Sequence, residues 1–196
     1  RTRARLVDAA RRVFERDGYI DARLADITAE ARCSTGTFYL YFANKEQVFH
    51  AVLEQVQDDM LHPGSGRLDD PETSPYAVIE ASNRAYLNAF KRNARLMMLL
   101  EQVATLDPNF RALRRRRGEA FVQRNARGIA NLQARGLVDT ELDAYQSASA
   151  LSAMVSFTAY YTYCVAEEDT PVEDLVRTCT RLWANALGLA PEARGR

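Results

Sequence analysis

The stretch Ser34–Phe49, STGTFYLYFANKEQVF, decides how the first third of the chain folds. Phe38 and Phe42 are four residues apart, so they share one face of a helix and can enter a core together. Tyr39 and Tyr41 fall off that face. Because so short a helix is not stable in water by itself, it must be held by its neighbours. The stretch predicts a packed helix with a second, outward-facing set of side chains.

Short helices on either side supply the rest of this core. The residues before the stretch predict one amphipathic helix that ends at Gly18 and a second that is capped by Asp21. Ser34 is expected to cap the third helix, roughly residues 35–41. The positions expected to face the core are Leu6, Ala10, Val13, Phe14, Leu24, Ile27, Ala31, Phe38, Phe42 and Val48.

The remaining chain also has helical periodicity, without the alternating runs that predict strands. We therefore predict an all-α fold of about nine helices. The expected helix starts are the Asn44 and Gln47 capping box, Ser74 with Pro75, Arg95, Asp107 with Pro108, Thr140 with Asp143, and Thr170 with Pro171 and Glu173. Helix ends or breaks are expected near Leu61, Arg92, Thr105, Gly118, Gly136, Glu167 and Gly188.

Composition indicates a folded chain in a reducing compartment. The 196 residues carry 26 basic and 26 acidic side chains, so a nucleic-acid partner would have to be bound by a local patch. The three cysteines are far apart and lack CxxC spacing, which favours neither disulfides nor zinc. We find neither an apolar run of about 18 residues nor a secretory leader, and we expect a cytoplasmic protein without membrane contact. The opening RTRAR is typical of the end of a longer basic arm.

The chain is expected to divide into three parts. Residues 1–46 form a small helical domain, 47–188 a larger helical domain, and 189–196 a disordered tail. A segment rich in Pro, Gly, Asp and Ser, His62–Pro75, reads as a flexible loop.

The second and third predicted helices, joined by the tight break RCS, make a helix-turn-helix. The third helix has its N-terminal part free to enter a major groove, which is about 12 Å wide. Its outward face carries a mixed aromatic and hydroxyl surface, which needs a partner. The expected partner is double-stranded DNA.

Residues from about Leu6 to Leu53 resemble the DNA-binding domain of the TetR family of bacterial transcriptional regulators. The resemblance rests on LVDAARRVFERDGY, LADITAEA, STGTFYLYF and NKEQVF, in this order. It implies a ligand-responsive regulator, in particular a repressor that leaves a palindromic operator when a small molecule binds.

The resemblance also implies roles for single residues. Tyr39, Tyr41 and Thr37 would donate to phosphate oxygens. Lys45, at the first turn of the next helix, would grip a phosphate together with free backbone amides. Gly36 permits close approach to bases, and Thr35 and Leu40 would touch base edges or a thymine methyl.

Several positions depart from the family pattern, among them Thr35 and Leu40, where the family often carries basic or polar groups. Arg32 stands where the family has Gly in the turn, and a left-handed conformation there costs about 1 kcal/mol for other residues. Ala22 stands where the family has a hydroxyl residue at the start of the second helix. That phosphate contact is either lost or taken over by the guanidinium of the neighbouring Arg23.

Two wide apolar stripes near the end of the chain are either intramolecular core or a subunit interface. The resemblance implies a homodimer built from these last two helices, which would place two reading helices about 34–36 Å apart. The predicted interface residues are Leu151, Val155, Leu175, Cys179, Leu182, Trp183 and Ala186.

The resemblance further implies a pocket for a largely apolar effector among the middle helices. Most aromatic and Met side chains there must be core, and a few polar groups would fix the ligand. The predicted pocket residues are Tyr86, Phe90, Met97, Phe121, Asn125, Met154, Phe157 and Tyr161.

The basic run Arg114–Arg117 points around a helix and is expected to be a solvated surface with one structural ion pair, rather than a patch for DNA or an anionic ligand. His50 and His62 lack metal-ligand spacing, so we expect neither metal nor cofactor. A catalytic set cannot be assembled, which predicts that the protein is not an enzyme. The alternatives are a helical small-molecule-binding protein or enzyme with a purely structural helix-turn-helix, and a TetR-like activator.

Overall fold

The computed structural model describes residues 1–61, 74–167 and 169–189, and all regular elements within them are helical, as predicted. The helices are α1 (Thr2–Asp21), α2 (Leu24–Glu30), α3 (Thr35–Tyr39), α4 (Lys45–Leu61), α5 (Pro75–Arg92), α6 (Ala94–Leu106), α7 (Pro108–Ala134), α8 (Ala144–Tyr160) and α9 (Val172–Ala186), with a π-helical turn η1 (Tyr161–Val165) directly after α8. Most of the predicted loop and tail, residues 62–73 and 190–196, and with them His62, lie outside the described residues.

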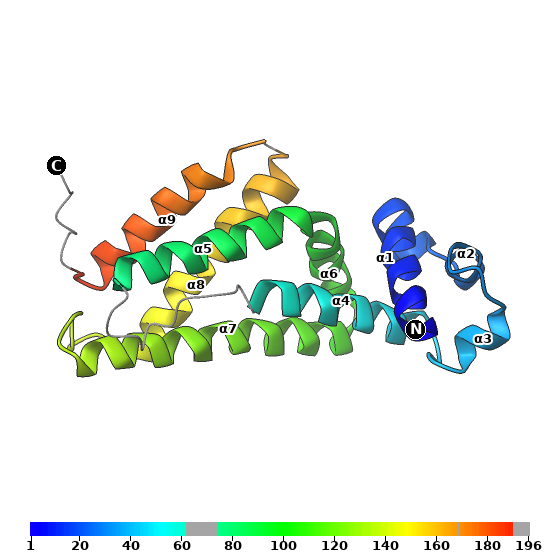
Figure 1. Ribbon diagram of the computed structural model, residues 1–196, viewed down its shortest axis with the longest axis horizontal. Coiled ribbons are helices and arrows are strands. Elements are labelled where there is room, and N and C mark those ends of the chain that lie inside the picture. The colour runs from blue at the N-terminus through cyan, green and yellow to red at the C-terminus, as the bar shows by residue number, and fades with distance from the viewer. Residues whose placement is uncertain (62–73, 168, 190–196) are drawn as a thin grey trace.

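The helices form a long molecule with a small end and a large end (Figure 1). α1, α2 and α3 lie together at the small end, and α5 to α9 make up the large end. α4 runs from the first group into the second, where it lies near α7. α1 packs on α2, α4 and α6, while α7 packs on α6 and α8, and α5 packs on α9. α4 is therefore the element that both ends share.

Several helix starts follow directly from the sequence. The Ser34 hydroxyl accepts from the Thr37 amide at 3.1 Å, and the Asn44 side chain accepts from the Gln47 amide at 2.9 Å. Gln47 completes the capping box by accepting from the amide of Ala43. Ser74 and Asp107, each followed by Pro, cap α5 and α7 in the same way.

Four predicted signals were wrong. α2 begins after Arg23 without a side-chain cap, so Asp21 does not cap it. Asp143, rather than Thr140, caps α8. α9 begins after Pro171, again without a side-chain cap, so the predicted Thr170 cap is not formed. Gly118 does not interrupt α7, because one residue of low helix propensity is outweighed by the packing of a 27-residue helix.

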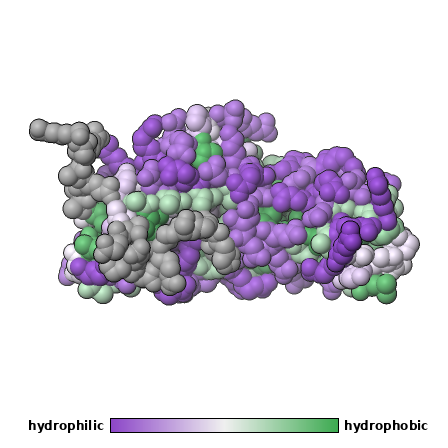
Figure 2. Space-filling view, in the orientation of Figure 1, coloured by the Kyte–Doolittle hydropathy of each residue, from purple (hydrophilic) through white to green (hydrophobic). Residues whose placement is uncertain are grey.

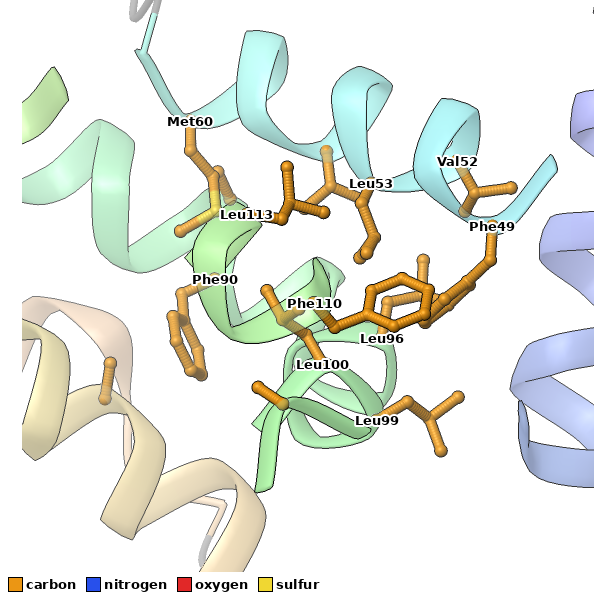
Figure 3. Close-up of a cluster of buried hydrophobic side chains, with 14 of the residues drawn as sticks. Phe49, Val52, Leu53, Met60, Phe90, Leu96, Leu99, Leu100, Phe110 and Leu113 are labelled. Carbon is orange, nitrogen blue, oxygen red and sulfur yellow. The ribbon is translucent and has the colours of Figure 1, made fainter. Parts of the chain in front are cut away.

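The core is continuous from the small end to the large end. Phe49 of α4 lies with its ring centroid 4.8 Å from Phe14 and 5.4 Å from Phe110 of α7. Figure 3 shows Phe49, Val52 and Leu53 of α4 facing the side chains of α6 and α7. Among the described residues, no helix is long and apolar enough to span a membrane.

The turn between α2 and α3 has the left-handed residue that the sequence indicates. Arg32 has φ +50°. Its amide donates to the carbonyl of Ala29, and the amide of Cys33 donates to the carbonyl of Thr28. This pattern ends a helix most easily with Gly. The side chain at position 32 is exposed, so its replacement removes no buried surface.

We predict that Arg32→Gly stabilises the protein by about 0.5–1 kcal/mol, since Gly adopts positive φ without the strain of a side chain. Urea unfolding followed by circular dichroism measures this difference. The matched control is Ala29→Gly in α2, where the same new residue should destabilise by about 1 kcal/mol. A loss of stability in Arg32→Gly would contradict the strain assigned to this turn.

Candidate nucleic-acid interface

α3 is five residues long and is held from both its start and its inner face. Ser34 caps it, and the Ser34 and Thr37 hydroxyls lie 2.9 Å apart. Phe38 is completely buried, and its ring centroid lies 5.7 Å from that of Phe42, which is 4 % exposed. The predicted division of the rings is therefore correct: the two Phe side chains fix the helix onto its neighbours.

The other side of α3 is open. Tyr39 is 55 %, Leu40 80 % and Tyr41 44 % exposed. Thr35 and Gly36 are also exposed. Exposure of large apolar or aromatic side chains in one short segment is unusual for a surface that meets only water. Figure 2 shows an apolar spot at the end of the molecule where α3 lies in Figure 1, on an otherwise mostly hydrophilic face.

The structure brings most of the predicted DNA-contacting residues together on α3 and the turn after it. Thr37 is half-buried and its hydroxyl is hydrogen-bonded to that of Ser34, so its O–H is free to donate to an outside group when Ser34 is the donor of that pair. Arg23 lies apart from α3, exposed at the start of α2. Beside it Ala22 is 3 % exposed, so this position contributes to the core.

Lys45 is engaged within the protein. Its ammonium donates to the carbonyls of Tyr19, Ile20 and Ala22, at 2.7, 3.0 and 3.0 Å, and lies 4.8 Å from the centroid of the Tyr19 ring. All three ammonium donors thus have acceptors at the end of α1. Loss of hydration lowers the pKa of Lys45 below its ordinary value. The side chain ties the start of α4 to the end of α1.

Arg5 also donates hydrogen bonds to backbone carbonyls at the end of a helix, and the sequence analysis did not predict this. Its guanidinium donates to the carbonyl of Ala31 at 2.7 Å and to that of Arg32 at 3.3 Å. Cations are favourable where a helix ends, because the last carbonyls lack helical partners. The left-handed turn is therefore held from α1. One Arg among several near the start of a helix gave no signal that it would reach 26 residues along the chain.

The face beside α3 is acidic in one place. An open groove next to Tyr41 is lined by Arg3, Glu46 and Glu54 among others. Two carboxylates disfavour a phosphate there. The outward face of α3 itself carries neither acid nor base, and it is the surface best suited to a groove of DNA.

The predicted effector residues are divided between the interior and the surface. Tyr86 lies against Phe121, with centroids 5.3 Å apart, and Asn125 donates to Ser152 at 2.9 Å. Met97 and Met154 are partly buried around them, and Phe90 is 2 % exposed. Phe157 and Tyr161, however, are 65 % and 52 % exposed. They lie one turn apart on the outer face of α8 and η1, so in the protomer they are not enclosed with the other predicted pocket residues.

The predicted dimer residues are also divided between the interior and the surface. Four of them are at most 9 % exposed and pack in the protomer's own core, where a second subunit cannot reach them: Leu151, Val155, Cys179 and Trp183. Leu175 is partly buried, whereas Leu182 and Ala186 are exposed. Of the predicted set, Leu182 and Ala186 stay accessible to a partner, and the use of α8 and α9 in a dimer stays a prediction.

The basic run on α7 also differs from its prediction in one residue. Arg114, Arg115 and Arg116 are exposed, and Arg114 pairs with Glu101 at 2.6 Å. Arg117 is 5 % exposed, and within the described residues it takes part in no ion pair. A signal was available, because Leu113 and Phe121 lie one turn before and after it on the same face.

The comparison with known proteins agrees with this geometry. Residues 6–52, which span α1 to most of α4, match the family model of bacterial regulatory proteins of the tetR family. The chain is 27 % identical over 162 residues to the HTH-type transcriptional regulator TtgR of Pseudomonas putida, covering 79 % of this chain and 76 % of the relative. Both matches indicate a TetR-family transcriptional regulator.

Two further proteins are similar to this chain, one in its fold and one in part of its sequence. A putative TetR-family regulator from Mesorhizobium loti superposes with a TM-score of 0.79 at 20 % identity, over 95 % of this chain and 96 % of the other. The HTH-type transcriptional repressor SCO4008 of Streptomyces coelicolor is 41 % identical over 59 residues, 30 % of this chain and 31 % of the relative. Together these similarities indicate a DNA-binding transcriptional regulator.

We predict that Lys45→Met lowers the free energy of unfolding by about 1–3 kcal/mol, because it removes the donor from carbonyls at the end of α1. Chemical denaturation is the measurement. The control is Lys91→Met at the chain's other lysine, which pairs on the surface with the exposed Asp169 and should change stability little. Equal effects of the two substitutions would rule out the structural role of Lys45.

Proposed function

We propose that the protein is a ligand-responsive repressor, whose homodimer binds a palindromic operator through the outward faces of two α3 helices. The observation that carries the proposal is the division of α3: Phe38 anchors it completely, while Tyr39, Leu40 and Tyr41 stand exposed. Rigid support with an open face is what an element needs to enter a major groove.

In the proposed complex, phosphate contacts fix position and base contacts give sequence preference. Tyr39 and Tyr41 donate to phosphate oxygens, with Thr37 and Arg23 beside them. Thr35, Gly36 and Leu40 meet the base edges. Lys45 serves the interface chiefly by fixing the start of α4, since its ammonium is held by α1. Several relatives carry the word repressor in their names, which supports repression over activation.

The proposed dimer uses the outer stripe of the last helices. This stripe consists of Phe157, Tyr161 and Val165, which are 65, 52 and 52 % exposed, and Leu182 of α9, which is 46 % exposed. Large apolar side chains repeated at one-turn spacing on a surface are typical of a covered interface. A second copy is the expected cover, because a two-fold dimer matches a palindromic site.

Footprinting on the DNA that flanks the protein's own gene tests the proposal directly. A protected palindrome with two half-sites is expected. If the protein protects no DNA but turns over or retains a small molecule, the alternative of a helical binding protein or enzyme with a structural helix-turn-helix replaces it. Increased transcription from the protected promoter in the presence of the protein would instead identify an activator.

We predict that Tyr39→Phe and Tyr41→Phe each weaken operator binding about 3–10-fold, the value of one lost hydrogen bond to phosphate. Fluorescence anisotropy with a labelled operator at several salt concentrations measures it. Tyr145→Phe is the control, because that phenol is also exposed but donates to Glu119 at the large end. Unchanged affinity in both α3 variants would remove the Tyr residues from the interface.

We predict that Phe157→Glu combined with Leu182→Glu weakens dimerisation at least tenfold, because it places charges in an apolar interface. Sedimentation velocity over a range of protein concentrations reports the dissociation constant. Leu106→Glu, at the end of α6 and 77 % exposed, is the control and should leave the dimer intact. A dimer that survives the double substitution would place the interface elsewhere.

A further inference from the structure

Among the residues that the structure describes, Arg117 is a charged side chain inside the large end without a counter-ion. Arg117 is 5 % exposed, although the three residues before it are exposed Arg. It lies on the inner face of α7, one turn after Leu113 and one turn before Phe121. The sequence thus places a cation in line with two apolar core positions.

The hydrogen bonds of Arg117 leave its charge unbalanced. One terminal nitrogen donates to the backbone carbonyl of Leu53 in α4, and the other lies 3.9 Å from the sulfur of Met97. A carbonyl and a thioether are neutral acceptors. Asp58, the acid whose field reaches it, is exposed and makes no ion pair with it in the described part of the chain. Burial lowers the pKa of Arg117 to about 10, so the guanidinium remains charged at neutral pH.

The Tyr86 phenol is the group whose field acts most strongly on Arg117, ahead of Asp58. The field of Arg117 and that of the Tyr86 phenol act on each other, and the Tyr86 ring packs edge-on against Phe121 at 5.3 Å. Desolvation raises the pKa of Tyr86 well above its ordinary value, so this phenol keeps its proton and remains a donor. Tyr86 and Phe121 are partly buried, in contrast to the fully packed Leu87 and Ile129 of the same helices.

A buried cation is stable in a protein when it is paired, and an unpaired one is retained at a cost. A guanidinium with a phenol donor beside it matches the oxygens of a carboxylate, and Met and aromatic side chains match an apolar body. The same arrangement is unsuited to a neutral or cationic ligand, which would leave the charge of Arg117 uncompensated.

We propose that the effector of this regulator is an organic carboxylate with an apolar body, and that Arg117 and Tyr86 receive its carboxylate. The inference rests on the proposed ligand-responsive function and narrows its effector from an apolar molecule to an anionic one. It also assigns a mechanism, because Arg117 holds α4 through the Leu53 carbonyl. A carboxylate competes for the same guanidinium and loosens α4 from α7, and α4 leads directly to the DNA-binding end.

The test uses the full-length protein and four probes, octanoate, decanoate, benzoate and phenylacetate, each compared with its own primary amide. Isothermal calorimetry gives affinity, and anisotropy with the footprinted operator gives release. At least one carboxylate is expected to bind at least tenfold more tightly than its amide and to weaken operator binding. Arg117→Met, which keeps the length of an apolar side chain, should abolish that preference.

Arg116→Met is the matched control, because it removes an exposed charge from the neighbouring position of the same helix. It should respond to the carboxylate as the unmodified protein does. Equal binding of acids and amides by the unmodified protein, or an unchanged carboxylate preference in Arg117→Met, overturns the inference.

Two further results separate this inference from the proposed function. If the protein binds its operator but none of the four acids binds or releases it, only the effector assignment is rejected. If the protein protects no DNA, the proposed function is rejected. If Arg117→Met unfolds, Arg117→Lys provides the second test: it keeps the charge but loses the fork of donors, and it should bind the acid more weakly while still preferring it to the amide.

Discussion

The packing of Phe38 in the core is the interaction on which the proposed DNA binding by α3 depends. A five-residue helix has too few internal hydrogen bonds to persist, so its position is set by side chains that enter the core. Phe38 and Phe42 provide this support, and the Ser34 cap fixes where the helix begins. Arg5 and Lys45 then hold the turn before α3 and the helix after it to α1. The exposed Tyr39, Leu40 and Tyr41 can therefore be presented in one fixed arrangement.

α4 connects this arrangement of side chains to the rest of the molecule. Its first turn is bonded to the end of α1 by Lys45, and Phe49 joins the aromatic cluster between Phe14 and Phe110. Further along, the carbonyl of Leu53 is held by Arg117 from α7. A change at the large end thus has a continuous set of contacts through which to reach α3. The two-state behaviour of a regulator requires such a shared element.

The sequence predicted the elements whose signals are local. The caps at Ser34, Asn44, Ser74 and Asp107 and the core face of α3 are decided by residues within one or two turns of each other. Signals that depend on competition with neighbouring residues failed. Thr140 and Asp143 are both good caps, and only packing selected the second.

Contacts between residues far apart in the chain were also not predicted from the sequence. Which stripe of α8 and α9 is inward depends on the helices they meet, so four of the predicted dimer residues turned out to lie in the protomer's own core. The Arg run was interpreted as solvated from its charge, although the spacing of Arg117 from Leu113 and Phe121 marks this residue as inward. The ties made by Arg5 and Lys45 depend on the ends of other helices.

Amide hydrogen exchange of the protein with and without its footprinted operator tests the central claim most directly. If the supported face of α3 reads DNA, the operator should slow exchange in residues 35–41 and at the start of α4, and leave the exposed basic run of α7 unchanged. Protection of residues 114–116, with residues 35–41 exchanging as in the free protein, would contradict the account.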